Sequence, residues 1–213
     1  MLVDSELLSA QMVIEVLAEI GVIVDLPFVY QNFVGHSFTT VAASYAHEHG
    51  RNVPSDFVEE YRRRLLESFE GRLKPMAGIE AVLADLTVPT CVATGSSPTR
   101  VAKSLDVTGL AHHFSGNVFS TNLVGRGKPH PDIFFYAAKA MGVDPQACLV
   151  IEDSTAGVNG AKTADMTTWH FTGGVHFNHG YQHVTPPPLV DRKFDRMSKF
   201  FDAAPELRRK SES

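Results

Sequence analysis

The stretch that decides the fold is Cys148-Leu-Val-Ile-Glu-Asp-Ser-Thr-Ala-Gly157. It opens with apolar residues, which is typical of a strand buried on both faces of a sheet. A helical pattern then runs from Ser154 to Ala164. A buried strand that leads directly into a helix indicates a parallel sheet covered by helices. The carboxylates of Glu152 and Asp153 stand where this strand ends.

The same alternation of strand and helix extends in both directions, from Pro75 onward. Apolar runs predict strands over residues 90–94, 118–120, 148–152 and 167–171. Helical patterns predict helices over residues 78–86, 99–106, 131–141, 154–164 and 192–201. The fold class that follows is α/β, with a parallel sheet. Because ligands of such sheets bind beyond the carboxyl ends of the strands, we expect Thr94, Glu152 and Asp153 at one rim.

Residues 4–70 have helical periodicity and no strand pattern. The first helix has apolar residues at four-residue spacing, and we expect Ser5 to cap it and Gly21 to end it. Further helices are predicted over residues 26–33, 37–49 and 55–70. The change of pattern near residue 75 predicts two domains, an all-helical one over residues 5–74 and an α/β one over residues 75–205.

The composition fits a globular protein and excludes several partner classes. Hydrophobic residues make up 44% of the 213 residues and charged residues 20%. The formal net charge of −5 argues against a nucleic-acid-binding surface, which usually needs a basic stripe. Cys91 and Cys148 stand in apolar runs, so each is interpreted as a small buried residue and not as half of a disulfide. No apolar run approaches the ~18 residues of a membrane span, and no signal-peptide pattern opens the chain. We expect a cytoplasmic protein with no nucleic-acid and no membrane partner.

The first cluster with chemical potential is Thr94-Gly-Ser-Ser97, directly after a predicted strand. Small hydroxyl residues with a glycine offer backbone N–H groups and a hydroxyl at a helix N-terminus, which suits a phosphate group. The alternative is a capped turn before the next helix.

The second cluster is Gly127-Lys-Pro-His-Pro-Asp132, just before a helix. Lys128 is held between a glycine and a proline, where its charge can neutralise a phosphoryl group or a carboxylate. The alternative is a solvated turn lysine. A lysine at the rim buries few apolar atoms, so we expect its replacement to change folding little. Asp132 is interpreted as a helix cap.

The third cluster is the Glu152-Asp153 pair at the end of the buried strand. Adjacent carboxylates repel each other, and a hard cation such as Mg²⁺ relieves the repulsion through oxygen ligands. The alternative is a pair that caps the following helix.

Together, T-G-S-S, G-K-P-x-P-D-I-F and V-I-E-D-S-x-x-G resemble motifs of the haloacid dehalogenase (HAD) superfamily of hydrolases. The helical front half is similar to the helical cap of its phosphoglucomutase-like branch. The resemblance runs from Leu2 to about Gly174. It implies a Rossmann-like core, a Mg²⁺ cofactor, and phosphoryl transfer through an aspartyl-phosphate.

The resemblance also implies a role for each rim residue. Thr94 would hold the transferring phosphoryl group, with Gly95 and Ser96 binding the substrate beside it. Lys128 would stabilise that group and orient the nucleophile. Glu152 and Asp153 would hold Mg²⁺, directly or through water.

The family's first motif is D-x-D-G-x-L-V-D-S-E, in which the first Asp attacks phosphorus and the second is the general acid/base. Residues 2–6 match its end, which implies a nucleophile before Met1. The strand that carries it, between those ending at Thr94 and Glu152, would also be missing. Two explanations compete: a start assigned too late, which the intact remainder favours, and a truncated, inactive relative. Residues 1–213 alone are expected to lack phosphatase activity.

Three further groups have both a functional and an ordinary interpretation. His36 resembles a residue of the cap's substrate-facing loop, but a solvated loop histidine is as good an interpretation. The arginines at 62–64 fit a solvated helix face better than a phosphate clamp. The histidines at 176, 179 and 183 fit a polar loop better than a metal site.

The leading hypothesis is therefore a Mg²⁺-dependent phosphatase of small phosphorylated metabolites, such as sugar phosphates. A phosphomutase of the same family is the close alternative. A haloacid dehalogenase fits less well, because its chemistry needs no metal. A non-catalytic relative that binds phosphorylated metabolites is the alternative from a different class.

Overall fold

A computed structural model describes residues 1–33, 38–48, 50–51, 53–178 and 189–210. The chain divides into two compact units. The first comprises Met1–Val3, Lys74–Gly174 and Thr185–Ser213, and the second comprises Asp4–Leu73 and Val175–Val184. None of the helices in the described ranges has both the length and the apolar character that crossing a lipid bilayer requires.

The strands of the first unit are parallel and form two groups. In one group β1 (Val92–Thr94) pairs with β2 (Val118–Ser120). In the other, β4 (Thr167–Phe171) lies between β3 (Leu149–Glu152) and β5 (Arg192–Phe194). Among the described residues no ladder joins β1 to β3. These parallel strands and their helices confirm the predicted α/β class.

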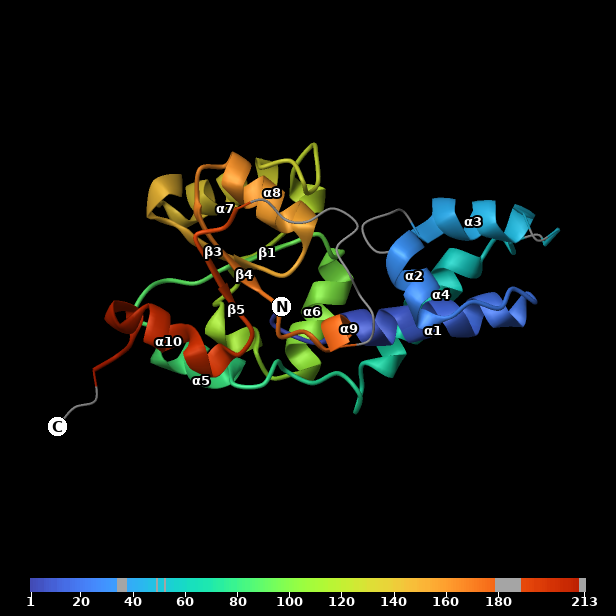
Figure 1. Cartoon of the computed structure of the whole chain (residues 1–213), viewed down its shortest axis with the longest axis horizontal. Helices are drawn as coiled ribbons and strands as arrows, with labels where there is room; N and C mark the ends of the chain where they lie inside the picture. Colours follow the sequence, from blue (N-terminus) through green and yellow to red (C-terminus); the bar gives the residue numbers. More distant parts are fainter. Residues whose placement is uncertain (34–37, 49, 52, 179–188, 211–213) are drawn as a thin grey trace. The chain divides into compact units, whose positions relative to one another are not determined.

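Helices cover both faces of these strands (Figure 1). Helices α7 (Asp132–Met141) and α8 (Thr155–Thr163) lie on one face, and α5 (Ile79–Asp85) and α10 (Phe200–Ala203) lie on the other. The unit also contains α6 (Pro98–Val107) and the short 3₁₀ turns η1 (Ala111–His113), η2 (Thr121–Leu123), η3 (Pro145–Ala147), η4 (Met197–Lys199) and η5 (Pro205–Leu207). Two apolar clusters follow from this layering. The larger one contains Val92, Trp169 and Phe194, and the smaller one lies between α7 and α8.

The helix predicted over residues 192–201 is wrong in its first half. Residues Arg192–Phe194 form β5, which pairs with β4 so that Trp169 lies opposite Arg192 and Phe171 opposite Phe194. The Asp191 carboxylate also accepts a hydrogen bond of 2.7 Å from the Thr168 backbone N–H. Pairing with a neighbouring strand overrides the local helical pattern here.

Among its described residues the second unit contains helices and no strand, which agrees with the prediction for residues 4–70. It contains α1 (Ser5–Glu19), α2 (Leu26–Asn32), α3 (Phe38–Glu48), α4 (Phe57–Ser68) and α9 (Val175–Asn178). The predicted apolar spacing is confirmed in α1, where Met12 and Val16 are buried, and Gly21 follows the helix in a left-handed conformation. The predicted cap at Ser5 is wrong, because Ser5 is the first helical residue and Asp4 precedes it. The Asp4 carboxylate instead accepts a hydrogen bond of 3.0 Å from the Val175 backbone N–H.

Helices α7 and α8 pack closely at Gly160. A β-carbon there would lie 2.8 Å from the Phe134 ring and 3.1 and 3.2 Å from the carbonyl oxygens of His130 and Pro129. Two of these three neighbours are backbone atoms, which yield less easily than the end of a flexible side chain. Gly160 therefore sets the distance between the two helices, and with it the position of the segment that carries Lys128.

We expect Gly160→Ala to lower the free energy of unfolding by about 1–2 kcal/mol. Overpacking costs roughly 1–3 kcal/mol, and the better helix propensity of alanine returns up to about 1 kcal/mol. Thermal unfolding measures the effect as a fall in the midpoint of roughly 2–8 °C. Gly125→Ala is the matched control, because a β-carbon at Gly125 has nothing within 4 Å. Equal midpoints for the two variants would contradict the packing at Gly160.

Candidate active site

Thr94 is the last residue of β1. Hydrogen bonds to the hydroxyl groups of Thr94 and Ser97 fix the turn that follows. The Ser96 backbone N–H donates to Thr94 Oγ1 at 3.1 Å, and the Arg100 N–H donates to Ser97 Oγ at 3.3 Å. The predicted capped turn is therefore present. It does not exclude a ligand, because a hydroxyl that accepts one hydrogen bond keeps its own O–H to donate. Gly95 is exposed, with open space beside its α-carbon.

Lys128 is not a solvated turn lysine. Its ammonium group donates to the Ala93 carbonyl oxygen at 3.0 Å and forms an ion pair with Glu152. The two side chains are only 13% and 10% exposed, and the Phe134 ring lies 5.1 Å from the lysine nitrogen. The premise that this lysine is little buried is therefore wrong, and we expect its replacement to lower the free energy of unfolding, because a nearly buried carboxylate would lose its partner. Lys128 joins the end of β1 to the end of β3.

Glu152 is held from several sides. One carboxylate oxygen pairs with Lys128, and the other accepts a hydrogen bond of 3.3 Å from Ser154 Oγ. Ser154 also caps α8, because its Oγ accepts the Gly157 N–H at 3.0 Å. The N-terminal end of a helix carries partial positive charge, so the start of α8 attracts the Glu152 carboxylate.

Asp153 stands directly after β3, and its carboxylate lies 2.9 Å from the backbone nitrogen of Met1. Magnesium is commonly held by one or two carboxylates, with phosphate and water completing its shell, and Asp153 fits that pattern. In the described ranges no third His, Cys, Asp or Glu side chain joins the two carboxylates to make a cluster of three.

Asp132 does not cap α7. It is the first residue of that helix, and its carboxylate accepts two hydrogen bonds from Arg126, at 2.9 and 2.8 Å. The hydrogen bonds from Arg126 lower the pKa of the Asp132 carboxyl. This residue therefore belongs to a surface ion pair.

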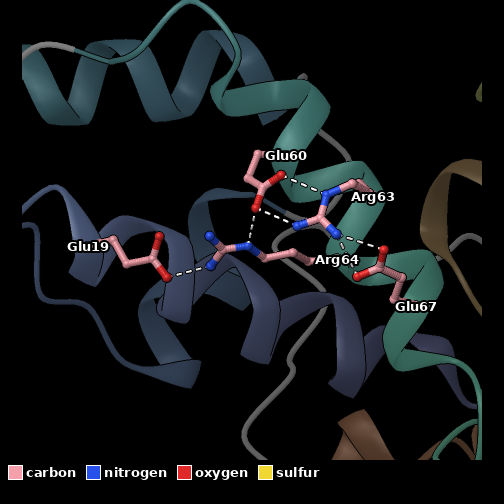
Figure 2. A network of polar contacts seen from close by, with 5 residues as sticks. All are labelled: Glu19, Glu60, Arg63, Arg64 and Glu67. Atoms are coloured by element: carbon pink, nitrogen blue, oxygen red, sulfur yellow. Dashed lines mark hydrogen bonds and ion pairs between the residues drawn. The ribbon is translucent and has the colours of Figure 1, made fainter.

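The arginines on α4 lie in a network of carboxylates, which Figure 2 shows. Arg63 pairs with Glu60 and Glu67, and Arg64 pairs with Glu60 and Glu19. Hydrogen bonds from the two arginines lower the pKa of Glu60 to about 2. Because both guanidinium groups are matched by carboxylates, the network supports the solvated helix face and not the phosphate clamp.

The histidines singled out in the sequence are placed only in part. His36, His179 and His183 lie outside the described residues. His176 is buried in the short helix α9, so the polar loop predicted for this segment is wrong at His176.

Sequence reasoning missed several residues that shape the rim. Gly157 lies against the Glu152 carboxylate, and the Ala93 carbonyl accepts from Lys128. His170 lies opposite Glu152 in the β3–β4 register and is 1% exposed. Burial lowers the pKa of His170, and a hydrogen bond with the Asp153 backbone opposes that shift. A polar residue within an apolar strand pattern was the available signal for His170, whereas a backbone carbonyl leaves none.

Comparison with known proteins assigns this chain to a family. Residues 2–165 match the model of haloacid dehalogenase-like hydrolases. The 6-phosphogluconate phosphatase of Escherichia coli (strain K12) is 29% identical over 176 residues, which cover 82% of this chain and 80% of the relative.

Two solved structures share the fold. A HAD family hydrolase from Deinococcus radiodurans R1, solved with bound phosphate and sodium, superposes with a TM-score of 0.74 at 29% identity, covering 96% of this chain and 91% of its own. A putative beta-phosphoglucomutase from Thermotoga maritima superposes with a TM-score of 0.75 at 17% identity, covering 97% of this chain and 94% of its own. At that identity the similarity shows the fold alone.

The family match spans more than half of the chain, and the fold agrees with it on both units. The resemblance drawn from the three motifs is confirmed: the chain belongs to the haloacid dehalogenase-like hydrolases, with the fold of their phosphoglucomutase-like branch.

Proposed function

We propose that the protein, in a form that includes the family's D-x-D pair, is a phosphatase of small phosphorylated metabolites, such as sugar phosphates. The observation that carries this proposal is the position of the Lys128 ammonium group, fixed between the Ala93 carbonyl and Glu152 beside the Thr94 turn. A positioned cation next to hydroxyl and N–H donors suits the charge that develops on a transferring phosphoryl group. The relatives agree with it, since one is named for 6-phosphogluconate and another holds phosphate.

Each rim residue has a role in this proposal. The Thr94 hydroxyl donates a hydrogen bond to the phosphoryl group, and Gly95 and Ser96 bind the substrate beside it. Lys128 stabilises the negative charge that develops on the phosphoryl oxygens. Asp153 would hold Mg²⁺, and Glu152 would reach the ion through water, because Lys128 and Ser154 already engage its oxygens. When bound, the ion would supply positive charge to the phosphate oxygens.

The remaining parts of the proposal concern the setting. The helical residues 5–74 act as a cap that selects the substrate, with His36 on its substrate-facing loop, and residues 75–205 form the Rossmann-like core. The protein acts in the cytoplasm. The family's D-x-D pair has no counterpart in residues 1–213, so turnover is measured on a full-length protein, meaning the chain extended at its N-terminus by the family's D-x-D-G segment.

Phosphate release tests the proposed activity directly. We expect the full-length protein to release phosphate from 6-phosphogluconate or a hexose phosphate with Mg²⁺, and to lose that activity in excess chelator. A malachite-green assay measures it. Interconversion of glucose 1-phosphate and glucose 6-phosphate without release would support the phosphomutase instead. Tight binding of phosphate with no turnover of any sugar phosphate would support the non-catalytic relative.

Lys128→Met should affect both turnover and stability. Loss of one electrostatic stabiliser typically lowers turnover by ~100-fold or more. The nearly buried Glu152 carboxylate would also lose its partner, which should cost about 2–4 kcal/mol of folding free energy. The double variant Lys128→Met/Glu152→Gln is the matched control, because it removes both charges. We expect it to regain most of the thermal midpoint and none of the turnover. Near-normal turnover in Lys128→Met would remove the central residue of the proposal.

Asp153→Asn should weaken magnesium binding by roughly tenfold or more, the scale seen when a metal site loses a supporting group. Calorimetric titration with Mg²⁺ measures this without reference to activity. Asp132→Asn is the control, because Asp132 lies in an ion pair with Arg126. A similar loss of affinity in both variants would argue that neither carboxylate is a specific ligand.

A further inference from the structure

We propose that Gly157 is a positioning residue for the Lys128 ammonium group, acting through Glu152. The bare α-carbon of this glycine forms the surface on which the Glu152 carboxylate lies. The placement of Lys128 follows from the contacts alone, and its consequence for turnover rests on the proposed phosphatase function.

The Glu152 carboxylate occupies the space that a side chain at position 157 would take. A β-carbon on Gly157 would lie 2.1 Å from Oε2, 2.2 Å from the carboxyl carbon and 2.6 Å from Oε1 of Glu152. Ordinary van der Waals contacts begin near 3.4 Å. Any other residue at position 157 would therefore displace the carboxylate.

Backbone conformation does not explain the glycine. Gly157 lies within α8 and is not among the glycines with a positive φ. Alanine would favour the helix by up to about 1 kcal/mol. The local helix therefore favours alanine, and the carboxylate requires glycine.

A displaced Glu152 carboxylate cannot move without changing its partners. Its backbone is fixed by the pairing of β3 with β4, and its two oxygens bind Lys128 and Ser154. Moving the carboxylate away from α8 therefore shifts or breaks the ion pair. The lysine nitrogen would keep only its bond to the Ala93 carbonyl and would become more accessible. Misplacing a reacting or stabilising group by about 1 Å can cost 100-fold in rate.

The reactivity of Lys128 tests this placement without reference to catalysis. The full-length protein is treated briefly with acetic anhydride, and mass spectrometry follows the acetylation of Lys128 relative to the exposed Lys139. In Gly157→Ala we expect the ratio to rise several-fold, with turnover falling at least tenfold. Gly125→Ala, where the added methyl has open space, should leave both at the wild-type value. An unchanged labelling ratio in Gly157→Ala would overturn the proposal.

A second substitution separates positioning from simple destabilisation. Glu152→Asp shortens the side chain by one methylene and leaves room for a methyl group at position 157. We expect Gly157→Ala to raise Lys128 labelling much less in the Glu152→Asp background than in the wild type. Equal increases in both backgrounds would show that Gly157 acts by another route. If the full-length protein releases no phosphate, the proposed function fails, while the labelling ratios still decide the role of Gly157.

Discussion

The ion pair between Lys128 and Glu152 is the interaction on which the candidate site depends. It connects the ends of β1 and β3, which share no ladder hydrogen bond among the described residues. Breaking such a pair by removing one partner leaves a charge without compensation in a poorly solvated place. The positive charge of Lys128 that suits phosphate chemistry therefore also stabilises the rim. The same side chain contributes to the proposed function and to folding.

Much of the fold could be predicted from the sequence, because its elements have strong local patterns. The strand from Leu149, the helix from Thr155 and the front helices follow from apolar periodicity and capping residues. Residues Arg192–Phe194 could not, since their strand depends on pairing with β4. Ser5 failed as a cap because it is itself the first residue of the helix, and the Asp4 carboxylate before it binds the Val175 N–H instead.

The candidate site was predictable in its residue types and less so in their contacts. The motifs brought Thr94, Lys128, Glu152 and Asp153 to one rim, and the structure places the first three around the ends of β1 and β3. The motifs did not predict that Lys128 is buried, because its burial depends on a residue distant in the sequence, Ala93, and on how the Phe134 ring is placed. The prediction that Asp132 caps a helix failed because its carboxylate binds Arg126, which lies six residues away in a turn.

The separation of the strands into two groups has a consequence for alignment along the strand axes. A backbone ladder fixes the offset between two strands to a single residue step. Apolar contact fixes no such offset, because it is non-directional, and the larger apolar cluster contains residues of both groups. Within the described chain, the bond of Lys128 to the Ala93 carbonyl and its ion pair with Glu152 are directional contacts that join the two groups. They therefore restrict how far the ends of β1 and β3 can slide past each other.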